Sequence, residues 1–181
     1  MVDIQDIHHL KLVTRHGKLV IKMYRIGVIS DTRIHSENEK LPEKVIEAFE
    51  NVDLILHAGN IFKEHVLERL EEIAPVHAVR GALDKPEDFT RELPEKKILK
   101  IDDYRIGLFN EFPGNKVAME HGINILIHGN TCIPRIKESK EIRLILNPGT
   151  PFAKHSLKYK NGTIILLKMR GQMLFSYIIK V

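Results

Sequence analysis

The 181 residues include no tryptophan and one cysteine, Cys132. A single cysteine cannot form a disulfide within one chain, so we do not expect a disulfide-stabilised secreted domain, and a reducing compartment fits the composition. No apolar run approaches the roughly 18 residues that a membrane helix needs. The first six residues are acidic where a signal peptide would be basic. We therefore expect a soluble, cytoplasmic protein without a membrane partner.

Aromatic residues are also scarce, at 6% of the chain, and no block of five or more basic residues occurs. Because nucleic-acid surfaces combine a basic patch with stacking aromatics, the formal charge of +4 does not indicate a nucleic-acid partner. Charged residues make up 29% of the chain and are rich in lysine and glutamate, a composition typical of heat-adapted organisms. The hydrophobic fraction of 43% is enough for the core of one domain.

The first half of the sequence alternates between strand and helix patterns. Apolar runs at 24–30, 54–57 and 76–79 predict strands. Between them, apolar residues at helical spacing predict one helix that begins at Pro42 and a second over 66–73. Since β-α-β-α-β order requires crossover connections, the sheet that these strands form should be largely parallel.

The second half reads as a second sheet with short connections. We expect a hairpin of 97–101 and 104–109, a short helix over 117–121 and strands at 123–127 and 144–146. The tail predicts a meander, with one turn at Asn161-Gly162 between 157–159 and 164–167, and another at Arg170-Gly171 before 173–181.

The expected domain covers residues 23–181, because the first strand of the alternating pattern begins near Tyr24. Residues 1–22 precede it as an N-terminal extension. Two arrangements remain open for this extension: a hairpin of 10–13 against 19–21, or a loosely attached segment.

Five of the expected strands end in a short polar signature. The signatures are Ser-Asp-Thr-Arg at 30–33, His-Ala-Gly-Asn at 57–60, Gly-Ala-Leu-Asp at 81–84, Phe-Asn at 109–110 and Gly-Asn-Thr-Cys at 129–132. In open α/β sheets, ligands bind beyond the carboxyl ends of the strands, so these signatures predict one shared pocket. The alternative is that they are ordinary turns, in which Asn, Asp and Gly are common.

The order and spacing of these signatures, followed by Asn147-Pro148-Gly149, resemble the calcineurin-like metallophosphoesterases. The resemblance covers about residues 24–181 and is strongest to their small bacterial and archaeal phosphodiesterases and to the retromer scaffold subunit of the same fold. It implies a four-layer α/β/β/α sandwich of two mixed sheets flanked by helices. It also implies a two-metal site between the sheet edges.

At the metal-ligand positions the sequence departs from that family, which places Asp-x-His, Gly-Asp, Gly-Asn-x-Asp, a His and Gly-His-x-His after successive strands. Among the usual ligands only Asp31 is unchanged. Arg33 stands for the first His, Asn60 for the bridging Asp and Ala82 for the Asn before Asp84, while Asn110, Asn130 and Cys132 stand for the later histidines.

These replacements predict that no metal cofactor binds. Two divalent ions about 3.5–4 Å apart need an anionic bridge, and the amide of Asn60 is neutral. Arg33 adds a permanent cation, which we expect to pair with Asp31 and also with Asp84. If a metal did bind, Asp31 and Asn60 would be its first candidate ligands, and His35, His57 and His128 would be the candidates to compensate for the lost ones.

Three functions follow as alternatives. The first is a catalytically silent module that binds or assembles with a protein partner, with a homo-oligomer also open. The second is a phosphodiesterase with a rebuilt site, in which Asp31, His57, Asn60, Asp84 and His128 hold Mn²⁺ or another divalent transition metal. The third is anion or nucleotide binding, without hydrolysis, by Arg33 and the amides of Asn60, Asn110 and Asn130.

Overall fold

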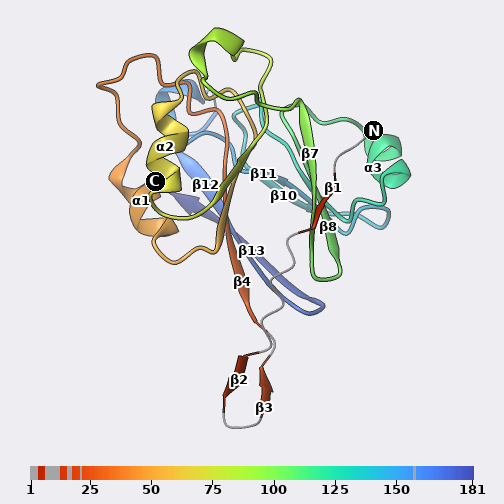
Figure 1. Ribbon diagram of the computed structural model, residues 1–181. Helices are drawn as coiled ribbons and strands as arrows, with labels where there is room; N and C mark the ends of the chain where they lie inside the picture. The colour runs from red at the N-terminus through yellow and green to blue at the C-terminus, as the bar shows by residue number, and fades with distance from the viewer. Residues whose placement is uncertain (1–3, 7–12, 16–17, 21, 157) are drawn as a thin grey trace.

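Residues 4–6, 13–15, 18–20, 22–156 and 158–181 are described from a computed structural model of the chain (Figure 1). Two mixed sheets form the centre, with helices on their outer faces. A separate two-stranded sheet pairs β2 (Val13–Arg15) with β3 (Lys18–Val20). None of the described helices is long and apolar enough to cross a membrane.

The five-stranded sheet has the order β13-β12-β4-β5-β6. Its first three strands in the chain run parallel, as predicted, because the helices between them serve as crossovers. Strand β12 pairs antiparallel with both β4 and β13. The bounds are β4 (Tyr24–Ile29), α1 (Glu43–Phe49), β5 (Leu54–His57), α2 (His65–Glu71), β6 (Val76–Ala78), β12 (Thr163–Arg170) and β13 (Met173–Lys180).

The six-stranded sheet has the order β1-β7-β8-β9-β11-β10. Strands β7 and β8 form the predicted hairpin, while β8, β9 and β11 run parallel. The bounds are β1 (Ile4–Asp6), β7 (Lys96–Ile101), β8 (Tyr104–Phe109), α3 (Asn115–Glu120), β9 (Ile125–Ile127), β10 (Arg135–Glu138) and β11 (Leu144–Asn147). Short 3₁₀ turns cover Pro86–Asp88 and Ala153–His155.

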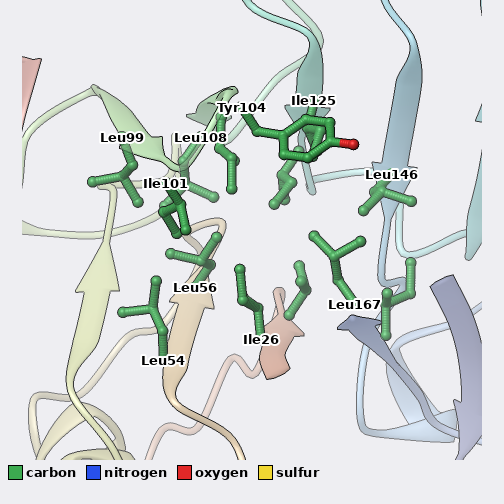
Figure 2. Packing of buried hydrophobic residues seen from close by; sticks show 14 of the residues in the cluster. Ile26, Leu54, Leu56, Leu99, Ile101, Tyr104, Leu108, Ile125, Leu146 and Leu167 are labelled. Carbon is green, nitrogen blue, oxygen red and sulfur yellow. The ribbon is translucent and has the colours of Figure 1, made fainter. Parts of the chain in front are cut away.

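Three apolar clusters hold four layers together. The largest fills the space between the two sheets, where side chains such as Ile26, Leu56 and Ile125 face one another (Figure 2). A second cluster joins α1 and α2 to the outer face of the five-stranded sheet, and a third joins α3 to the other sheet. Strands β5, β9 and β11 are buried on both faces, and apart from the last residues of β5 and β11, His57 and Asn147, their sequences are apolar. The predicted α/β/β/α sandwich is confirmed.

Some elements differ from the predictions. None of residues 158–162 is in a strand, so the hairpin expected around Asn161-Gly162 is wrong for the part that the structure describes; residue 157 lies outside it. Gly162 instead packs against Pro151, whose carbonyl oxygen would lie 1.9 Å from an added Cβ. Strand β10, with the sequence Arg-Ile-Lys-Glu, was not predicted, because an edge strand with charged side chains carries little apolar signal.

Candidate functional site

The five signatures meet at one edge of the sandwich, where the parallel strands of both sheets end. Asp31 N donates to the carbonyl of Gly59, and Gly129 N donates to the carbonyl of Asn110. The two sheets are joined here by the side chain of Asn60, whose Nδ2 lies 3.1 Å from Oδ1 of Asn130. The shared pocket that the strand ends predict is therefore a set of interlocked loops.

Asp31 is the centre of this network and is fully buried. Its Oδ1 accepts hydrogen bonds from the guanidinium of Arg33 and from Nδ2 of Asn60, both at 2.8 Å. Its Oδ2 accepts from Oγ of Ser30 at 2.9 Å and from the backbone N–H of Asn130 at 2.8 Å. Four protein donors thus occupy the carboxylate oxygens that a metal would need.

Asp84 is held differently, because its partners are backbone groups. Its Oδ1 accepts from the N–H groups of Ile61 and Phe62 at 2.6 and 2.9 Å, and its Oδ2 accepts from those of Asn60 and Gly81 at 2.9 and 2.7 Å. Burial raises the pKa of Asp84 from its ordinary value, and these four N–H groups oppose the rise. Since both oxygens are taken up by amides, the expected ion pair between Arg33 and Asp84 is wrong.

Asn60 and Asn110 use their amides to hold the loops. Oδ1 of Asn60 accepts from Leu83 N at 3.1 Å. Asn110 donates from Nδ2 to the carbonyl of Ala58 at 2.7 Å and accepts from Ala82 N at 3.1 Å. Ala82 itself is exposed and offers no ligand atom in its side chain. The amides at 60 and 110 are therefore committed to the protein and are not free to bind an anion.

The candidate compensating histidines do not converge on Asp31. His57 is fully buried; its Nδ1 accepts from Gly59 N at 3.1 Å, so the ring proton sits on Nε2, 3.2 Å from Thr32 Oγ1. His35 is exposed and packs edge-on against Phe62, with ring centroids 4.8 Å apart. The contacts of His57 are with Thr32 and Gly59 and the ring contact of His35 is with Phe62, so neither contact involves Asp31.

His128 and Cys132 lie closer to the network but are also poor ligands. Nδ1 of His128 lies 3.3 Å from Nδ2 of Asn147, and burial lowers the pKa of His128. Cys132 is buried, and burial followed by the charge of Asp31 raises the pKa of its thiol to about 11. Because a thiol binds metal as the thiolate, this environment disfavours ligation by Cys132.

The backbone of the site has the same unfavourable conformation, a positive φ angle, at three places. Six non-glycine residues have positive φ angles in three pairs, each pair two residues apart: Asp31 and Arg33, Asn60 and Phe62, and Asn130 and Cys132. Each such residue costs on the order of 1–3 kcal/mol unless its surroundings hold it in place. The hydrogen bonds to Asp31 and Asp84 supply that restraint here.

These residues do not fit a two-metal centre. Asp31 is saturated by donors, Arg33 places a cation beside it, and the bridging position holds the amide of Asn60, which already donates to Asp31. Within the described residues, no three His, Cys, Asp or Glu side chains are grouped so that they could hold a metal ion. The polar groups at this edge of the sandwich therefore form a closed hydrogen-bond network.

Two contributors to the network were not among the predicted site residues. Ser30 directly precedes Asp31, and its place in the first signature was the available signal. Thr150 donates from Oγ1 to the carbonyl of Asp31 at 2.9 Å, although it lies 119 residues away in the sequence. No spacing rule connects Thr150 to the first signature, so only the fold reveals this contact.

The burial of His57 predicts a pH dependence of stability. Burial lowers its pKa from 6.5 to about 3, so between these values the unfolded chain binds a proton that the folded chain does not. The free energy of unfolding should therefore fall as the pH drops through this window, by at most about 1.4 kcal/mol per pH unit from this residue. In urea titrations over pH 3.5–7, His57→Gln should reduce the slope by up to one proton; equal slopes would contradict the assignment.

Comparison with known proteins identifies the class. The model of the calcineurin-like phosphoesterase superfamily domain matches residues 24–172, and the chain belongs to this family. A curated relative from Methanothermobacter thermautotrophicus, named "probable metallophosphoesterase", is 34% identical over 163 residues, covering 86% of this chain and 91% of the relative. A protein of the same description from Methanocaldococcus jannaschii is 38% identical over 135 residues, covering 70% of this chain and 67% of that protein.

Solved structures show the same fold at lower identity. Vacuolar protein sorting 29 (Vps29) from Cryptosporidium parvum has a TM-score of 0.76 and 24% identity, covering 88% of this chain and 92% of its own. Vps29 from Entamoeba histolytica, solved in complex with zinc, has a TM-score of 0.71 and 20% identity, covering 87% and 98%. A structure described as a novel archaeal phosphodiesterase has a TM-score of 0.66 and 23% identity, covering 86% and 99%.

Proposed function

We propose that this protein is a catalytically silent member of the superfamily that acts as a binding module without metal. The observation that carries the proposal is the saturation of Asp31 by four donors, one of them the guanidinium of Arg33. A metal would have to displace Arg33 and Asn60 together and leave a partly buried guanidinium without its carboxylate. A reducing compartment such as the cytoplasm suits the free thiol of Cys132.

The mouth of the closed network is the surface that we assign to a protein partner. Exposed apolar side chains lie on three of its loops: Leu83 is 51% exposed, Phe112 45% and Ile133 39%. A depression of about 450 Å³ lies between two of these loops, 80–82 and 109–113, and is lined by Ala82, Asn110 and Phe112 together with the charged Arg80, Glu95 and Glu111. Apolar side chains around a saturated polar centre favour contact with a protein surface over contact with a charged substrate.

Anion binding through Arg33 receives less support. Its Nη2 donates to Asp31, and its Nε is buried without a partner. The amides of Asn60, Asn110 and Asn130, which would have completed an anion site, are engaged with other loop groups. Arg33 therefore serves first to neutralise the buried charge of Asp31.

A calorimetric titration of metal-stripped protein with Mn²⁺ tests the proposal. We expect no binding tighter than about 1 mM, because the first ligand would have to break the Asp31–Arg33 pair. A parallel assay with bis-p-nitrophenyl phosphate and Mn²⁺ should give the rate of the buffer alone. Micromolar binding together with hydrolysis would instead support the second candidate, a phosphodiesterase with a rebuilt site. That candidate is supported by the similarity to the archaeal phosphodiesterase structure.

A further inference from the structure

Strand β13 forms an edge of the five-stranded sheet, and among the described strands it pairs only with β12. Proteins protect such edges with short strands or with charged side chains. The other edges follow this rule: β1 and β6 have three residues each, and three of the four residues of β10 are charged. By contrast, β13 has eight residues and one charge, at its last position, Lys180. It is an unprotected edge.

The ladder fixes which backbone groups of β13 face outward. Val181 N donates across the ladder to the carbonyl of Gly162 at 2.9 Å. Because antiparallel strands alternate inward and outward groups, residues 173, 175, 177 and 179 face β12 in the same way. The N–H and C=O groups of Leu174, Ser176, Ile178 and Lys180 therefore point away from the sheet, toward a strand that is not supplied by the described part of this chain.

The side chains of this strand are apolar and exposed to an unusual degree. Met173 is 49% exposed, Phe175 44%, Tyr177 46% and Ile178 40%. The first three alternate along the strand and so share one face of the sheet. Figure 1 shows the tip of the β12–β13 hairpin in the lower part of the view, beyond the helices. An edge with both free backbone groups and exposed apolar side chains is a pairing surface.

We propose that a second copy of this chain pairs antiparallel with β13, with the two-fold axis at Ser176. Phe175 then faces Tyr177 of the partner subunit, and the same pair recurs on the other side of the axis. On the opposite face, Leu174 meets Ile178 of the partner subunit in the same two-fold manner. The interface is isologous, and it joins two five-stranded sheets into one continuous sheet.

The length of the strand and its one charge favour this register over its neighbours. Outward groups must meet outward groups, so the axis can shift only one residue at a time along the strand. With the axis at Ser176, Lys180 reaches the level of the neutral Gln172, in the turn that joins β12 to β13. An axis at Phe175 would carry Lys180 past this turn, because the chain folds back there and Arg170 lies on β12 beside Met173. An axis at Tyr177 would set Lys180 opposite the apolar Leu174. The first shift shortens the paired segment, and the second sets a charge against an apolar side chain.

Analytical ultracentrifugation of the full chain at micromolar concentrations tests the proposal. The wild type should sediment at twice the chain mass of 20.9 kDa. Ser176→Pro removes an outward N–H at the axis and leaves the ladder with β12 intact, so it should give a folded monomer with an unchanged circular dichroism spectrum. A monomeric wild type at about 100 µM, or a dimeric Ser176→Pro variant, would overturn the proposal.

A charge exchange tests the register. Phe175→Glu and Tyr177→Lys should each weaken dimerisation at least tenfold, because each removes both aromatic pairs across the axis, and the ammonium introduced at 177 keeps only a cation–π contact with Phe175 of the partner subunit. In an equimolar mixture of the two variants the new carboxylate faces the new ammonium, and a heterodimer should form. Two variants that remain monomeric when mixed would refute the axis at Ser176. Tyr159→Lys, at a tyrosine that is 38% exposed but outside β13, is the matched control and should stay dimeric; a monomer would show that β13 is not the interface.

Discussion

Replacement of Asp31 by alanine should lower the free energy of unfolding by about 3–5 kcal/mol, the range measured when one partner of a buried ion pair is removed. The change leaves the Arg33 guanidinium without its carboxylate, at a side chain that is only 22% exposed. It also frees Nδ2 of Asn60, Oγ of Ser30 and the N–H of Asn130, each of which now donates to Asp31. Urea denaturation at neutral pH measures the loss.

The double variant Asp31→Ala/Arg33→Met separates charge from packing. Because it removes both members of the ion pair, it should recover part of the stability that the single variant loses. Asp103→Ala, at an exposed carboxylate in the β7–β8 turn, is the control and should change stability by less than about 0.5 kcal/mol. If Asp31→Ala behaves like this control, the carboxylate does not organise the loops.

Restoration of ligands at three positions should create a metal site. In Arg33→His/Asn60→Asp/Cys132→His, the cation is removed, a bridging carboxylate is introduced and two imidazoles are added beside Asp31. The affinity for Mn²⁺ should rise at least 100-fold over the wild type. The loops already hold these positions in place through Asp84 and the paired positive-φ residues, so the backbone does not have to rearrange.

The restored site also predicts a coupling between metal and stability. Oδ1 of Asp31 lies 2.8 Å from the Asn60 amide, so a carboxylate at position 60 would repel it and destabilise the metal-free variant. Mn²⁺ at 100 times its dissociation constant should raise the free energy of unfolding of the variant by about 2.7 kcal/mol. Calorimetry and thermal unfolding with and without Mn²⁺ measure both effects. The variant Arg33→Gln/Asn60→Ser/Cys132→Ser removes the same groups without adding ligands; if it gains as much affinity, the added ligands are not the cause.

Much of the fold and part of the site could be predicted from the sequence, for identifiable reasons. Strands such as β5 and β9 are buried on both faces, so their apolar runs are unambiguous. The Asp31–Arg33 pair was predictable because the residues stand two positions apart and opposite charges in a buried loop must meet. Local sequence was sufficient wherever the decisive interaction was local or strongly apolar.

Other features depend on contacts that local sequence does not encode. Asp84 was expected to pair with Arg33, but it is satisfied by backbone N–H groups, which every non-proline residue carries and which leave no signal in the sequence. Asn161-Gly162 has the composition of a hairpin turn, yet Thr163 N donates to Thr150 O, and the segment before it packs without forming a strand. Strand β10 is determined by its neighbour β11 and not by its own composition.

The backbone hydrogen bonds to Asp84 determine which neighbouring side chains can be substituted without loss of those bonds. The residues at 61, 62 and 81 contribute main-chain amides to its carboxylate, so substitutions of the side chains at 61 and 62 leave these bonds in place. Gly81 is the exception, because an added Cβ would lie 2.2 Å from Asn60 N. One carboxylate and one absent side chain, those of Asp84 and Gly81, thus hold the main chain at the mouth of the sandwich, and the exposed side chains of Ala82 and Leu83 beside them can change without loss of these bonds.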